Sequence, residues 1–170
     1  MFSRKKRGGR PEGQEIFQGL RTQILNLDPS EITMDGSLAG RTVRGALMEM
    51  GYPNGTATLV SLGDGTTSLY VSSGGGIIGA GAHTRVVTAT QRFLAAVDDH
   101  LTLLAPDEDP GVPAAGRVVI RALTGQGRYS AAAQEDDLGR GLHPLSAVFR
   151  AGHGVLTELR MIDESRGAGA

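Results

Sequence analysis

Apolar residues recur at helical spacing in four segments of the chain, which predicts four amphipathic helices. We expect them over residues 14–27, 41–50 and 84–104, with the last beginning at Pro144. Asp28-Pro29 ends the first helix, because the residue before a proline is disfavoured in the α conformation. Gly51 is expected to cap the second helix, since glycine readily adopts the left-handed backbone angles found there.

Between these helices, runs rich in Thr, Val and Leu are bounded by glycine turns, a pattern typical of strands. Five such runs are present: residues 56–62, 66–72, 76–82, 117–123 and 128–133. Gly63-Asp64-Gly65 separates the first two and indicates a tight hairpin, because Asp-Gly tolerates the positive φ angles of hairpin turns.

The predicted order of elements is therefore ααβββαββα. Strands joined by short turns pair antiparallel, so we expect an α+β fold with an antiparallel five-stranded sheet and helices packed on it. One domain is predicted over residues 14–163, preceded by a flexible basic tail over residues 1–13 and followed by a frayed end over residues 164–170.

The composition of the chain mainly excludes certain classes of protein and site. The chain has 170 residues, 39% hydrophobic and 21% charged, as in an ordinary folded domain. It contains no cysteine, which excludes disulfides, thiolate metal sites and cysteine nucleophiles. Its apolar runs are shorter than the roughly 18 residues that span a membrane, and no signal peptide is recognisable. We therefore expect a cytoplasmic protein without a membrane span.

Charge is distributed unevenly along the chain. The whole chain has a net charge of −1, yet its first ten residues carry five positive charges, so the rest carries −6. A negative body repels nucleic acid. Nucleic-acid binding is therefore expected only through the cations of the tail, namely Arg4, Lys5, Lys6, Arg7 and Arg10.

Five of the 26 glycines of the chain lie in one conspicuous segment, residues 72–82. Gly74, Gly76 and Gly79 fit the spacing of a dinucleotide-binding loop, but that loop opens a helix directly after a strand, and here the helix begins only near residue 84. A close helix–strand contact near residues 76–82 is the structural alternative. The candidate ligand-binding residues are Ser72, Ser73, Gly74, Gly75, Gly76 and His83.

Catalytic and metal motifs are not apparent. The histidines at positions 83, 100, 143 and 153 lack metal-ligand spacing, and no nucleophile elbow is present. The acidic triplets at residues 107–109 and 135–137 lack calcium-loop spacing, and the second precedes a helix, where carboxylates are favoured. We therefore assign no catalytic residue, metal site or cofactor.

Three segments resemble a family of small uncharacterised bacterial proteins over about residues 45–160. They are residues 59–70 (LVSLGDGTTSLY), residues 74–79 (GGGIIG), and residues 135–145 with EDDLG and HPL. That family has no assigned activity, so no residue role follows from the resemblance. A looser likeness links the predicted fold to profilin-like and roadblock adaptor domains, although fold does not determine function.

Two functions remain open. The favoured one is a non-catalytic protein-interaction or adaptor domain of a bacterial cytoplasmic protein, with a protein partner or self-association as a homodimer through a helix or a sheet edge. The alternative is a small ligand- or nucleotide-binding protein, or an enzyme, that uses the glycine-rich turn at residues 73–76.

Overall fold

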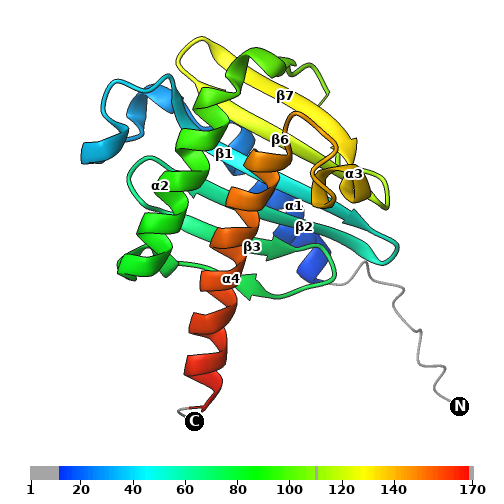
Figure 1. Ribbon diagram of the computed structural model, residues 1–170. Helices are drawn as coiled ribbons and strands as arrows, with labels where there is room; N and C mark the ends of the chain where they lie inside the picture. The colour runs from blue at the N-terminus through cyan, green and yellow to red at the C-terminus, as the bar shows by residue number, and fades with distance from the viewer. Residues whose placement is uncertain (1–11, 110, 169–170) are drawn as a thin grey trace, which may run out of the picture.

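The protein is built around one antiparallel sheet. The computed structural model describes residues 12–109 and 111–168 and confirms the α+β class, but the sheet has seven strands rather than five (Figure 1). Their spatial order is β4-β3-β2-β1-β6-β7-β5. The strands are β1 Val43–Tyr52, β2 Gly55–Leu62, β3 Thr67–Val71, β4 Gly76–Ile77, β5 Ala105–Pro106, β6 Arg117–Thr124 and β7 Gly127–Gln134.

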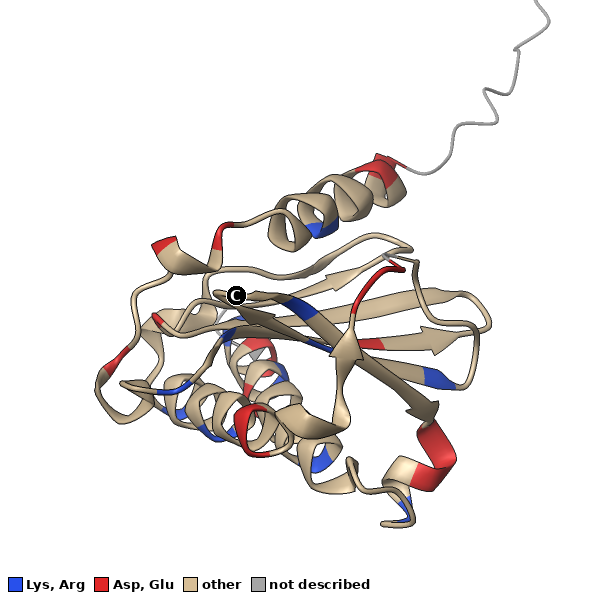
Figure 2. Ribbon diagram, turned by 90° about the horizontal axis from the view of Figure 1, so that it is seen from above, with Lys and Arg blue, Asp and Glu red and all other residues tan. Residues whose placement is uncertain are grey.

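Helices cover both faces of this sheet. Four α-helices are present in the described ranges: α1 Glu12–Leu25, α2 Thr84–Asp99, α3 Glu135–Gly139 and α4 Ser146–Ala168. Short 3₁₀ turns lie at residues 29–31, 36–38, 80–82 and 101–103. Helix α1 packs on one face, and α2 and α4 lie side by side on the other, which gives three layers (Figure 1, Figure 2).

The prediction of a helix over residues 41–50 is wrong, because this segment is the central strand β1. Met48 and Met50 pack toward α2 and α4, whereas Leu47 packs toward α1. A strand covered on both faces is buried at successive positions, so its sequence loses the alternation that identifies a half-exposed strand. The apolar residues of β1 therefore matched a helical period by coincidence.

The prediction of a strand over residues 76–82 is correct only for its first two residues. After β4 the chain turns at Gly79, which has a φ of +74°, and forms a 3₁₀ turn before α2. The 3₁₀ turn approaches the chain closely just before β3, since a Cβ on Gly81 would be 2.6 Å from the Gly65 carbonyl oxygen. A close contact between a helix and a strand is made by α4. A Cβ on Gly152 would be 2.6 Å from the Met48 sulfur on β1.

The remaining elements agree closely with prediction. The first helix, the hairpin at residues 63–65, both strands after residue 116 and the last helix are confirmed with small shifts of their ends. Helix α2 ends at Asp99, before a separate 3₁₀ turn, and residues 105–106, where no strand was predicted, form β5. The predicted basic tail lies outside the described residues, except for Glu12 and Gly13, which begin α1. No helix in residues 12–109 or 111–168 is long and apolar enough to cross a membrane.

Gly51 lies inside β1 and does not cap a helix. The main chain of the segment before β6 passes directly over it, so that a Cβ at this position would be only 2.0 Å from the Ala114 carbonyl oxygen. The Gly116 N–H also donates a hydrogen bond to the Gly51 carbonyl, at 2.9 Å. The absence of a side chain at Gly51 lets this segment cross the sheet.

We predict that Gly51→Ala destabilises the protein by about 2 kcal/mol, because backbone atoms must shift to admit the methyl group. Gly125→Ala is the matched control, since Gly125 lies in the β6–β7 turn with no atom within 4 Å of the added Cβ. Chemical denaturation of both variants measures the difference. Equal midpoints would contradict the packing argument.

Candidate functional site

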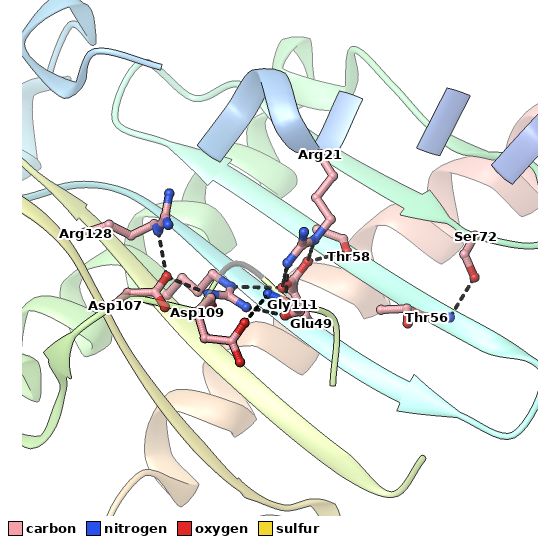
Figure 3. A network of polar contacts seen from close by, with 10 residues as sticks. Arg21, Glu49, Thr56, Thr58, Ser72, Asp107, Asp109, Gly111 and Arg128 are labelled. Carbon is pink, nitrogen blue, oxygen red and sulfur yellow. Dashed lines mark hydrogen bonds and ion pairs between the residues drawn. The ribbon is translucent and has the colours of Figure 1, made fainter. Parts of the chain in front are cut away.

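The glycine-rich turn connects β3 to β4. Gly74, Gly75 and Gly76 all have positive φ angles, of 110°, 83° and 148°. A Cβ on Gly76 would be 2.1 Å from the Leu69 carbonyl oxygen. Glycine is therefore required at this position for β4 to pair with β3. The Ser72 hydroxyl accepts a hydrogen bond from the Thr56 N–H at 2.8 Å (Figure 3).

A small cavity of about 280 Å³ lies between this turn and α1. Gly75 and Gly76 form part of its wall, and Phe17, Tyr70 and Ile78 contribute apolar or aromatic side chains. The described residues that line it carry no charge. Among these described residues, a phosphate group would find no cationic side chain.

His83 lies elsewhere. It is exposed at the residue before α2 and lines a groove between α2 and α4, on the opposite face of the sheet from α1. The structure therefore does not bring His83 together with Gly75 and Gly76, which line the cavity beside α1.

The other histidines make local contacts. The His100 ring lies 2.7 Å from the Ala96 carbonyl oxygen, and the His143 ring accepts a hydrogen bond from the Leu145 N–H. The His153 ring packs edge-on against Phe149, and burial lowers the pKa of His153. Within the described ranges, no group of three or more His, Asp or Glu side chains could hold a metal ion.

A buried ionic network lies on the α1 face of the sheet (Figure 3). At its centre is Glu49 on β1, whose side chain is 0% exposed. Its carboxylate accepts two hydrogen bonds from Arg21 on α1, at 2.7 and 3.0 Å, and one from Arg121 on β6, at 2.9 Å. The Thr58 hydroxyl donates a fourth, at 2.9 Å.

The network continues from Arg121 toward the edge of the sheet. Arg121 and Arg128 both donate to the Asp107 carboxylate, at 2.5 and 2.6 Å. The Gly111 carbonyl accepts hydrogen bonds from both Arg21 and Arg121, at 3.2 and 2.6 Å. These contacts attach α1 and the segment around residues 107–111 to the same face of the sheet.

Both carboxyl groups of this network are held ionised. Burial alone would raise the pKa of Glu49, but the hydrogen bonds and charges of Arg21 and Arg121 outweigh it and lower that pKa. The pKa of Asp107 is lowered in the same way, by Arg121 and Arg128 against the effect of burial. A carboxylate with four donors and no exposure is poorly suited to proton transfer, so we interpret the network as structural.

A long groove runs between α2 and α4 on the outer side of these helices. Its main part has a volume of about 560 Å³. The floor is formed by the small residues Ala89, Ala147, Ala151 and Gly154. A second part of about 420 Å³ shares Thr84, Arg85 and Glu158 with the first and continues to Met161, Ile162, Ser165 and Arg166.

Three arginines line the main part of the groove: Arg85 and Arg92 from α2, and Arg150 from α4. All three are exposed, and none forms an ion pair with another residue in the described part of the chain. Glu158 is the single carboxylate among the described residues that line the groove. Figure 2 shows several cationic segments along these two helices. Guanidinium groups with free donors bind carboxylates in a two-point geometry.

The groove was not predicted from the sequence. Its signal is a second stripe on each helix, away from the core residues. Arg85, Ala89 and Arg92 recur at helical spacing on α2, and Ala147, Ala151 and Gly154 do so on α4. Small residues at a surface stripe of two helices that pack together are the pattern that could have pointed to it.

We predict that Glu49→Gln lowers the free energy of unfolding at pH 7 by about 3 kcal/mol, because two buried arginines lose their counter-charge. Because folding lowers the pKa of Glu49, its ionised form stabilises the fold at pH values above 4.5, the ordinary pKa of the group. This stabilisation is lost as the pH falls through the lowered pKa of the folded state. Glu49→Gln should therefore also weaken the acid dependence of stability. Denaturation between pH 7 and pH 3 measures both effects.

The control is Glu108→Gln, at an exposed position that forms no ion pair within the described residues. It should leave stability nearly unchanged. If Glu49→Gln unfolds at the same denaturant concentration as the unsubstituted protein, the network does not contribute as described.

No protein-family model, curated protein or solved structure matches the chain. The resemblance to small bacterial proteins and the likeness to adaptor domains therefore stay predictions. The geometry and charge of the α2–α4 groove are the basis on which a function can be inferred.

Proposed function

We propose that the protein is a non-catalytic interaction module that binds an acidic segment of a protein partner in the α2–α4 groove. The observation that carries this proposal is the set of four exposed arginines along one groove, Arg85, Arg92, Arg150 and Arg166, which form no ion pair within the described residues. Arg21, Arg121 and Arg128, by contrast, pair with carboxylates on the α1 face.

Charge complementarity favours an anionic partner. The chain after its first ten residues carries a net charge of −6, so a cluster of unpaired cations is a local exception on a negative body. Such a cluster attracts anionic groups, while the rest of the surface repels them. Binding is therefore expected to be confined to the groove and to weaken as salt is added.

The shape of the groove favours a polymer over a small molecule. From Ala147 to Arg166, α4 lines it over about 28 Å, at a rise of about 1.5 Å per residue. Small-molecule sites are usually enclosed and bury most of their ligand, whereas this groove is open along its length. A second copy of the same groove fits poorly, because symmetric pairing would place arginines against arginines.

The test is the binding of a fluorescein-labelled, glutamate-rich peptide of about 20 residues, measured by fluorescence anisotropy. We predict that Arg85→Glu, Arg92→Glu and Arg150→Glu each weaken binding by about tenfold, because each replaces attraction by repulsion. Arg160→Glu is the control, since Arg160 is exposed on α4 but does not line the groove.

A version of the peptide with glutamine in place of glutamate should bind much more weakly. The proposal fails if the acidic peptide does not bind at physiological salt. It also fails if the groove variants and Arg160→Glu weaken binding equally.

A further inference from the structure

We infer that the bound segment is an amphipathic α-helix with a stripe of small residues, which lies along the seam between α2 and α4. This inference rests on the proposed function and specifies the conformation of the partner. The partner helix would then form a further layer outside α2 and α4.

The floor of the groove allows a close approach. Ala89 on α2 and Ala151 on α4 present only methyl groups, and Gly154 has no atom within 4 Å of a position where a Cβ would lie. Helices pack with their axes about 8–10 Å apart, and small residues at the contact favour the short end of that range. A partner helix with its own small residues can therefore rest on this floor.

The walls of the groove disfavour an extended peptide. An extended chain usually binds by adding its backbone to an exposed strand edge. Here both walls are α-helices, whose backbone N–H and C=O groups are used within each helix over most of its length. An extended peptide would find no partners in the walls for the backbone groups that face them, whereas a helix satisfies its own.

The lining of the groove gives the bound helix a defined pattern. Arg92 and Arg150 lie in the main part, Arg85 is shared by both parts, and Arg166 lies at the far end of α4. Met161, 47% exposed, and the partly buried Ile162 lie toward that same end. Acidic residues of the partner helix should therefore occur along its whole length, and larger apolar residues only near Met161 and Ile162.

The inference is tested with three labelled peptides of about 20 residues. The first is a capped helical peptide with alanines on one face and glutamates beside them. The second has the same composition in scrambled order, which keeps the charge but removes the alanine stripe. The third is the first with two central residues replaced by proline, which interrupts the helix.

We expect the first peptide to bind at least about tenfold more tightly than the other two. Gly154→Leu should remove this preference, because its side chain fills the floor of the groove. Gly19→Leu is the matched control: Gly19 is also an exposed glycine within a helix with open space around it, but it lies on α1. Neither substitution should unfold the protein, since leucine is a better helix former than glycine.

The outcomes separate the two claims. Equal binding of all three peptides, still sensitive to Arg92→Glu and Arg150→Glu, would overturn the helical partner and leave the acidic-segment function standing. Equal weakening by Gly154→Leu and Gly19→Leu would also overturn it. Failure of all three peptides to bind would overturn the proposed function itself.

Discussion

The fold depends on how the charge of Glu49 is neutralised in the centre of the sheet. A carboxylate with no solvent exposure is costly unless it is paired, and here it is paired by arginines from two different elements, α1 and β6. Helix α1 therefore has a defined position on the sheet, and its apolar residues, such as Phe17, complete the packing on that face. The same arginines reach the Gly111 carbonyl and hold the crossing segment in place.

The arginines of the buried network and those of the α2–α4 groove differ in whether a carboxylate neutralises their charge. On the α1 face, arginines are inward-pointing or partly covered, and their charge is matched by Glu49 and Asp107. On the outer side of α2 and α4, arginines are exposed without a counter-charge from the described residues. The paired arginines hold α1 on the sheet, and the unpaired arginines keep hydrogen-bond donors available for a partner. Loss of a network arginine should therefore affect stability, and loss of a groove arginine should affect binding.

Much of the fold could be predicted from the sequence, because most elements carry one-sided apolar patterns and clear turns. Residues 41–50 could not, since a strand buried on both faces has no alternation to detect. The ionic network was missed because its members are far apart in sequence: Arg21, Glu49 and Arg121 meet only in three dimensions. The groove was not predicted for a related reason. The glycine spacing at residues 72–76 is a local pattern and was interpreted as a candidate ligand site, whereas the groove forms only where α2 and α4 pack side by side.

Gly152 and Gly154 make the helical structure of α4, and with it the groove, dependent on packing against the sheet. Two glycines in the first half of α4 lower its intrinsic helix stability by about 1 kcal/mol each relative to alanine. Most of the stability of a helix in a folded protein comes from packing, and here Gly152 packs against Met48 on β1. The groove on the outer side of α4 therefore depends on a core contact on the inner side of the same helix.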